Sequence, residues 1–298
     1  MGNSVLDNTD FEDYLSELEL SVSGYKTGGK FTVFVEGIDD TILYEKFFNQ
    51  DRVIVSQTEG VSRLTEIVGR LDRHGLENYF IAIKDSDYDR INCSFPSYDN
   101  LFLTDKHDLE TTIISVAAVE MLLKENLRYA DIKKEKVETQ IIDGEALIFE
   151  ACDMLLDISY IRWYNNEYDK NINFDVLKFQ DVLSTYGALD SKSCLKYLLD
   201  NPCNKSVNVT SEDINVFKAD HAEVDDIFQL VRGHDLCEVL YILIKKNSYY
   251  RQKSNLSSDK IEMYLRLSFS KEQFRSTELY SNVKSYFDRL DYSNMLAC

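Results

Sequence analysis

Apolar residues in the first half of the chain form short runs that alternate with amphipathic segments. The runs are rich in Val, Ile and Phe and end at Gly or Asp, which is typical of buried strands. They lie at 30–37, 52–60, 78–87 and 100–105. Between them, 41–48 and 61–75 carry apolar residues at helical spacing, with Asp39 or Asp40 expected to cap the first helix and Gly75 to end the second. Because this alternation requires crossover connections, we predict an α/β fold with a mostly parallel sheet and helices on both faces.

Helical periodicity dominates the rest of the chain. Residues 107–127 are predicted to form one long apolar helix. Further amphipathic helices are predicted at 144–164, 174–187, 190–201, 222–247, 257–269 and 277–292. We therefore expect an acidic N-terminal segment at 1–24, a catalytic α/β domain at 25–135, and a helical domain at 136–298 for dimerisation, partner or substrate contacts.

The charge balance is acidic and uneven. The net charge is −19, and residues 1–150 hold 15 Lys and Arg against 30 Asp and Glu, whereas residues 151–298 hold 18 against 22. A protein that coats nucleic acid is basic, because its affinity comes from neutralising phosphates. A polyanionic substrate would therefore have to be met by a local basic patch, by metal ions, or with the help of a partner.

Three further features bear on the compartment. No run of about 18 apolar residues occurs, so no membrane-spanning helix is expected. The acidic N-terminus lacks the basic and apolar regions of a secretory signal. The six cysteines form no C-x-x-C pair, which favours neither a zinc site nor a disulfide framework. We expect reduced thiols in a cytoplasmic protein with no membrane partner.

Carboxylates follow three of the predicted strands. Glu36 ends the first strand, Asp85 and Asp87 end the third, and Glu110 lies shortly after the fourth. Because the carboxyl ends of parallel strands meet at one edge of a sheet, these acids are expected to lie together. Their mutual repulsion then calls for a cation, and oxygen ligands beside phosphate favour Mg²⁺, with Mn²⁺ as an alternative.

A metal ion held there would support phosphodiester cleavage. It would neutralise a phosphate oxygen and activate water or the leaving oxygen. Glu36 would ligate the metal or act as a general acid or base, Lys84 would steady the phosphate, and Asp40 is a further catalytic candidate at the same edge. The competing interpretation is that these residues are solvated loop acids and helix caps, and it applies most strongly to Asp40.

The order of these residues resembles the Toprim domain of topoisomerases, DnaG-type primases and OLD-family nucleases. In that domain one strand ends in Glu-Gly-x-x-Asp and a later strand ends in Asp-x-Asp. Here Glu36, Gly37 and Asp40 match the first motif, and Asp85 and Asp87 match the second. The resemblance implies a Toprim-like sheet, Mg²⁺ ligands at Asp85 and Asp87, and a general acid/base or metal ligand at Glu36.

Three later blocks, NLFLTDKHDLET, IRWYN and RGHDL, are similar to the DUF4435 branch of that superfamily. This branch is similar to the nuclease subunit of the PARIS anti-phage system. The resemblance implies a toxic endonuclease that cuts RNA, tRNA in the PARIS-like case, or DNA. It also implies control by an ABC- or AAA-type ATPase subunit, through which a phage trigger protein would act. An active homodimer is expected from the tyrosine-rich helical half.

Several groups in the helical half stay open between a functional and a structural role. Glu110 either completes a metal shell or belongs to a helix start. Arg232 and His234 either touch a substrate phosphate or flank a helix stop at Gly233, with Asp235 capping the next helix.

The strongest basic patch of the chain contains Lys245, Lys246 and Arg251, with interleaved tyrosines. It either grips RNA or single strands or is a solvated helix end. For the whole chain, the alternative to a nuclease is a non-catalytic Toprim-like module that docks a partner protein. Metal dependence distinguishes the two.

Overall fold

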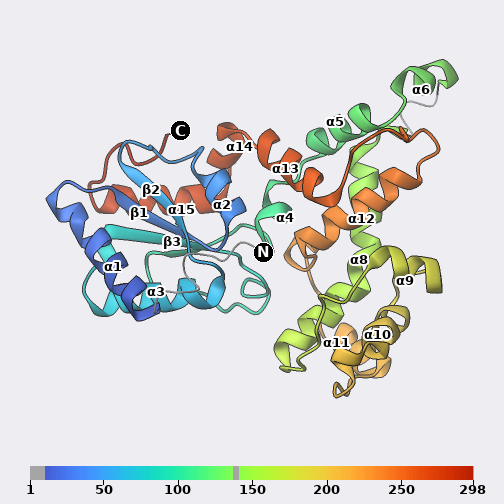
Figure 1. Ribbon diagram of the computed structural model, residues 1–298, viewed down its shortest axis with the longest axis horizontal. Coiled ribbons are helices and arrows are strands. Elements are labelled where there is room, and N and C mark those ends of the chain that lie inside the picture. The colour runs from blue at the N-terminus through green and yellow to red at the C-terminus, as the bar shows by residue number, and fades with distance from the viewer. Residues whose placement is uncertain (1–10, 137–140, 298) are drawn as a thin grey trace. The chain divides into compact units, whose positions relative to one another are not determined.

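The structure is a computed structural model that describes residues 11–136 and 141–297. The chain divides into two compact units, whose elements are labelled in Figure 1. Unit 1 takes the described parts of Met1–Ser86, Ser94–Asp105 and Phe269–Cys298, and unit 2 takes those of Asp87–Cys93 and Lys106–Ser268.

Unit 1 is built on a parallel sheet with the strand order β2-β1-β3-β4. The strands are β1 (Phe31–Val35), β2 (Val53–Gln57), β3 (Phe80–Lys84) and β4 (Leu101–Leu103). The central strands β1 and β3 are in register with Val35 opposite Ile83, so both end at the same edge of the sheet. The predicted α/β class with a parallel sheet is confirmed.

Helices cover both faces of this sheet, as predicted (Figure 1). On one face, α1 (Phe11–Ser23) and α3 (Val61–Arg73) share a core with Phe34. On the other face, α15 (Glu278–Arg289) places Phe287 with its ring 5.2 Å from that of Phe31. Phe31 and Phe34 contact different helices because side chains along a strand alternate between the two faces of the sheet. Unit 1 also contains α2 (Ile38–Tyr44) and α14 (Lys271–Arg275).

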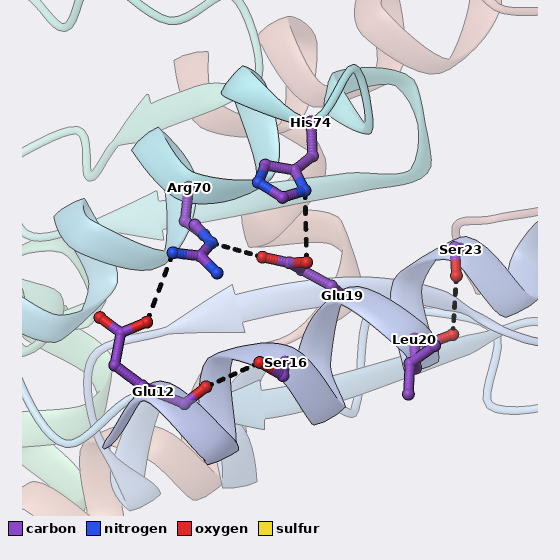
Figure 2. Close-up of polar contacts among 7 residues, drawn as sticks. All are labelled: Glu12, Ser16, Glu19, Leu20, Ser23, Arg70 and His74. Atoms are coloured by element: carbon purple, nitrogen blue, oxygen red, sulfur yellow. Dashed lines mark hydrogen bonds and ion pairs between the residues drawn. The ribbon is translucent and has the colours of Figure 1, made fainter. Parts of the chain in front are cut away.

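The acidic N-terminal helix α1 is joined to α3 by a small set of ion pairs (Figure 2). Arg70 donates a hydrogen bond from Nε to Oε1 of Glu19 at 2.5 Å, and Nδ1 of His74 lies 3.3 Å from Oε2 of the same carboxylate. Ion pairs that remain partly open to solvent stabilise a fold only weakly. The attachment therefore depends mainly on the burial of Leu15 and Val22.

Unit 2 is helical. Its helices are α4 (Leu109–Ile113), α5 (Val116–Asn126), α6 (Tyr129–Glu135), α8 (Gly144–Glu167), α9 (Phe179–Tyr186), α10 (Ser191–Asp200), α11 (Ser211–Asp220), α12 (Gly233–Lys246) and α13 (Ser258–Ser268). The long helix α8 packs against α5, α10, α11 and α12, and it is buried on several sides. The expected helical region is therefore present. Among residues 11–136 and 141–297, no helix has the length and apolar character needed to cross a membrane.

The two units divide the chain differently from the expected domains. The segment 106–135 packs with the helical unit 2, and Phe269–Cys298 returns to the sheet of unit 1. The return is fixed at the start of α15, where the carboxylate of Asp105 accepts the backbone N–H groups of Glu278 and Leu279, both at 2.8 Å. A helix that is far away in sequence therefore completes the sheet unit.

Several local predictions were wrong, and the helix expected at 222–247 begins only at Gly233. The expected helix at 107–127 breaks between α4 and α5, because Ser115 leaves the helix and caps α5 by accepting the N–H of Ala118. Helix α2 begins after Gly37 as its N-cap, not after Asp39 or Asp40. Gly233 is the first residue of α12, not a helix stop.

Helix α11 was missing from the prediction, although its start carries a local signal. Thr210 and Asp213 form a capping box in which each accepts the backbone N–H of the other. The capping pattern of a small polar residue followed three positions later by an acid marks such a start.

Candidate functional site

The carboxyl ends of β1 and β3 bring Glu36 and Asp85 together. Oε1 of Glu36 accepts a hydrogen bond from the backbone N–H of Asp85 at 3.0 Å. The contact follows from the parallel pairing of the two strands: Glu36 comes directly after Val35, which pairs with Ile83, and Asp85 comes directly after Lys84, the last residue of β3. Both residues are half-buried. The sequence-based expectation that these two acids share one strand edge is met.

The end of β3 is held in place from several sides. The ammonium of Lys84 donates to the backbone carbonyl of Asp85 at 3.1 Å. The backbone N–H of Ser86, which is buried, donates to Oγ1 of Thr104 at 2.9 Å. These bonds fix the turn that carries Asp85, and they keep the Lys84 ammonium beside it. The position of Lys84 fits the predicted contact with an anionic group, which stays a prediction.

Asp40 has a structural contact in the same region. Its Oδ2 accepts the backbone N–H of Gly37 at 2.8 Å, from the third position of α2. This bond satisfies a donor at the helix start that has no partner within the helix. Asp40 therefore has the structural role at a helix start that the competing interpretation assigns to it. Its catalytic role stays a prediction.

Asp87, the second acid of the Asp-x-Asp motif, belongs to unit 2. Its side chain is exposed, and its backbone N–H donates to the carbonyl of His107 at 2.7 Å. Its φ of 45° lies in the left-handed region, which Asp tolerates better than most residues. The part of the chain that the structure describes contains no group of three or more His, Cys, Asp or Glu residues arranged around a metal position. The convergence of Asp87 with Glu36 stays a prediction.

The donor set at the strand edge fits a magnesium ion. Mg²⁺ binds oxygen ligands, and in phosphate-handling sites it is held by one or two carboxylates together with waters and substrate phosphate. The fold brings the carboxylate of Glu36 to the backbone of Asp85, whose side chain supplies the second carboxylate of this strand edge. The fit therefore rests on the chemistry of this pair and does not require a third protein ligand.

A second cluster of charged residues lies inside unit 2, around the start of α12. Asp108 caps α4 by accepting the N–H of Thr111 at 3.0 Å, and its other oxygen accepts the N–H of Gly233 at 2.6 Å. Glu110 is buried, with an exposed fraction of 5%, and Oε1 lies 3.7 Å from Nη1 of Arg266. The structure thus places Glu110, a predicted metal ligand, against the helix start that contains the RGHDL block.

His234 forms the outer edge of this cluster. Its Nδ1 lies 2.8 Å from Oε1 of the buried Glu262. The hydrogen bond to Glu262 raises the pKa of His234 to about 9. Burial, reinforced by the charge of Asp108, raises the pKa of Glu110 to about 8. Both shifts favour the protonated forms of Glu110 and His234.

Asp235, the last polar residue of the same block, has a buried partner that the sequence did not reveal. Arg162 of α8 donates to it from Nε at 2.7 Å and from Nη2 at 3.0 Å. The guanidinium also stacks 4.3 Å from the ring of Phe174. The available signal was an arginine within the apolar segment of α8, because a buried charge must be paired. Asp235 is therefore not a helix cap but one half of an ion pair between α8 and α12.

The predicted substrate-binding cations occupy different environments. Lys245 and Lys246 are exposed at the end of α12, and the ammonium of Lys245 lies 5.3 Å from the ring of Tyr241. Arg232 is exposed at the N-cap of α12. Arg251 binds the protein itself, because its Nε donates to the carbonyl of Leu127 at 2.9 Å.

Lys245 and Lys246 of the basic patch are thus exposed to solvent. Arg251 has a hydrogen bond within the protein that its predicted role did not include. The substrate contacts of these cations stay predictions. Comparison of the chain with models of protein families and with curated proteins finds no match.

Proposed function

We propose that this chain is a magnesium-dependent nuclease whose reaction centre is formed by Glu36 and Asp85. The observation that carries the proposal is the hydrogen bond between Oε1 of Glu36 and the backbone N–H of Asp85. It joins two acids that are far apart in sequence at the carboxyl edge of a parallel sheet, where α/β proteins bind ligands. The Toprim-like order of these residues supports the same assignment.

Each residue of the centre has a distinct role in the proposed reaction. Glu36 and Asp85 hold the ion, which when bound neutralises a phosphate oxygen and lowers the pKa of coordinated water. Glu36 is oriented by the Asp85 amide, so its carboxylate also suits proton transfer to or from a reacting oxygen. Lys84, with its ammonium at the Asp85 carbonyl, contacts the substrate phosphate.

The substrate class follows from the resemblance and the charge. An acidic chain approaches a polyanion only where cations bridge the two, so metal is central to binding as well as to cleavage. We infer an RNA substrate, tRNA first and DNA second, in the cytoplasm. Control by a partner ATPase in anti-phage defence rests on the family resemblance alone.

The test is a cleavage assay with matched variants. Purified chain is incubated with tRNA or supercoiled plasmid and Mg²⁺, and the products are resolved on denaturing gels. Glu36→Gln and Asp85→Asn should each abolish cleavage, whereas Glu45→Gln, an exposed acid on the same unit, should leave it unchanged. Cleavage that persists at the wild-type rate in Glu36→Gln refutes the proposal.

A second candidate function, a non-catalytic docking module, is favoured by one observation. Asp40 and Asp105, both at this edge of the sheet, accept backbone N–H groups and so have structural contacts. If Glu36 and Asp85 served the same purpose, titration with Mn²⁺ would produce no heat and no paramagnetic broadening. Mn²⁺ binding that is lost in Asp85→Asn argues against the docking module.

A further inference from the structure

A pocket of about 240 Å³ lies in unit 2 between the end of α8 and helix α11. Its walls combine aromatic rings with carboxylates. The lining residues are Tyr164, Tyr168, Glu212, Asp213, Val216, Phe217 and Asp220. We call it the α8–α11 pocket. Apart from the tyrosines, the ionisable residues of the lining are the acids Glu212, Asp213 and Asp220. The pocket therefore carries a negative potential.

The aromatic part of the pocket is a preformed corner. Phe217 is buried, with an exposed fraction of 3%, and the rings of Tyr164 and Tyr168 lie 5.4 Å and 5.9 Å from it. The two tyrosine rings are 4.7 Å apart. Tyr168 is 52% exposed, so one wall of the corner faces solvent. Ring faces of this kind attract cations through their quadrupole.

A cation of the protein itself lies over the two tyrosine rings of this corner. The ammonium of Lys170 lies 5.6 Å from the ring of Tyr164 and 5.7 Å from that of Tyr168. Hydrogen bonds from Thr210 lower the pKa of Asp213, and the charge of Lys170 acts in the same direction. An ammonium group of the chain itself therefore already lies against these rings and near an acid of the pocket.

We propose that the α8–α11 pocket binds an alkylammonium group, either a lysine side chain of a partner protein or a free polyamine, in competition with Lys170. The carboxylates of Glu212 and Asp220 pair with the incoming charge, and the rings of Tyr164 and Tyr168 cover its methylene groups. The proposal goes beyond nuclease activity, because a phosphate group would be repelled here.

The size of the pocket agrees with this class of ligand. Pockets for drug-sized molecules span roughly 300–1,000 Å³, whereas this one has about 240 Å³. It therefore accommodates the end of a side chain or a short chain segment. The free-energy contribution of one exposed cation–ring contact corresponds to a change in affinity of about two- to fivefold.

The first experiment reads binding at a methyl group inside the pocket. In the full chain, the ¹³C-methyl signals of Val216 are followed during titration with Nα-acetyl-lysine-N-methylamide, with spermidine, and with the neutral analogue Nα-acetyl-norleucine-N-methylamide. The two ammonium probes should shift the signals, and the neutral probe should not. The probe that acts at the lower concentration identifies the source of the ligand. Equal shifts with the norleucine analogue, or no shift with either ammonium probe, overturn the proposal.

The second experiment separates a built site from general attraction to an acidic protein. Tyr168→Leu should weaken binding about two- to fivefold, whereas Tyr264→Leu, a comparably exposed tyrosine on α13, should not change it.

Lys170→Gln should tighten binding of the ammonium probes, because it removes the competing cation. The effect should be larger than that of Lys192→Gln, which removes an exposed lysine on α10. Equal effects of the paired variants would mean that charge alone attracts the probes and would overturn the site. Fluorescence of Trp163, whose ring lies 5.2 Å from that of Phe217, verifies that each variant is folded.

Discussion

Substitution of Gly233 by alanine tests how the buried cluster of unit 2 is assembled. A Cβ at this position would collide with Cβ of Glu110 and lie 2.5 Å from Oδ1 of Asp108. Carbon contacts settle at about 3.5–4.0 Å, so the start of α12 would have to move away from α4. Neither obstacle swings aside freely. The Glu110 atom is attached directly to the backbone, and Oδ1 of Asp108 is held by the backbone N–H of Thr111.

The expected loss has two parts. Forcing a methyl group into a filled space costs about 1–3 kcal/mol. The shift also breaks the 2.6 Å bond from the Gly233 N–H to Asp108, and a hydrogen bond to a charged group contributes about 1.5–3 kcal/mol. Gly233→Ala should therefore destabilise unit 2 by about 3–5 kcal/mol, which corresponds to a fall in Tm of about 6–20 °C.

The chain contains a single tryptophan, which makes the assay specific. Trp163 lies in α8 of unit 2, so its fluorescence during urea unfolding reports that unit. Gly24→Ala is the matched control, because a Cβ there meets nothing within 4 Å and its φ is not in the left-handed region. If Gly233→Ala shifts the Trp163 transition no more than Gly24→Ala does, the contact between α4 and α12 described above is wrong.

The remaining predictions concern other charged groups. Asp235→Ala should destabilise unit 2 by about 3–5 kcal/mol, because it leaves the charge of Arg162 buried without its partner; tryptophan fluorescence in urea measures this, and a loss below 1 kcal/mol would contradict it.

The pKa of Glu110 is raised from 4.5 to about 8, and that of His234 from 6.5 to about 9. The folded unit therefore binds more protons than the unfolded chain. Its stability should fall as the pH rises from about 5 to about 9. Urea midpoints measured in EDTA should show this fall, and Glu110→Gln should show a smaller one. Asp105→Ala should destabilise the start of α15 by about 1–2 kcal/mol, because two N–H groups lose their acceptor; hydrogen exchange that is unchanged along α15 would exclude it.

The strand-edge pair was predictable because its causes are local. The runs that form β1 and β3 are apolar and end at polar residues, and parallel pairing of such strands brings Glu36 and Asp85 to one edge. Helix starts with a local signal, such as the capping box of Thr210 and Asp213, were also available in the sequence, although α11 was not predicted from it. The break at Ser115 had the same kind of signal, a capping serine after a run of β-branched residues.

The buried cluster was not predictable, because it depends on which faces of distant helices meet. Arg162 and Asp235 lie on α8 and α12, and nothing in the spacing of either helix specifies the other. Glu110 was assigned from its distance to a strand end, whereas its raised pKa comes from burial inside unit 2 and from the charge of Asp108. A glycine at a close backbone approach looks in sequence like a glycine that ends a helix, which explains the wrong prediction at Gly233.

The two proposed cation sites select different cations for a physical reason. Mg²⁺ holds its water shell tightly and exchanges those waters only for hard oxygen ligands, which Glu36 and Asp85 provide from positions fixed by the sheet. The α8–α11 pocket also contains carboxylates, but its rings of Tyr164 and Tyr168 add an apolar surface that favours an organic ammonium with an apolar stem. An alkylammonium ion at the strand edge would in turn lack the double charge needed to activate water. The strand edge is therefore proposed for the metal, and the ring-lined pocket for the alkylammonium group.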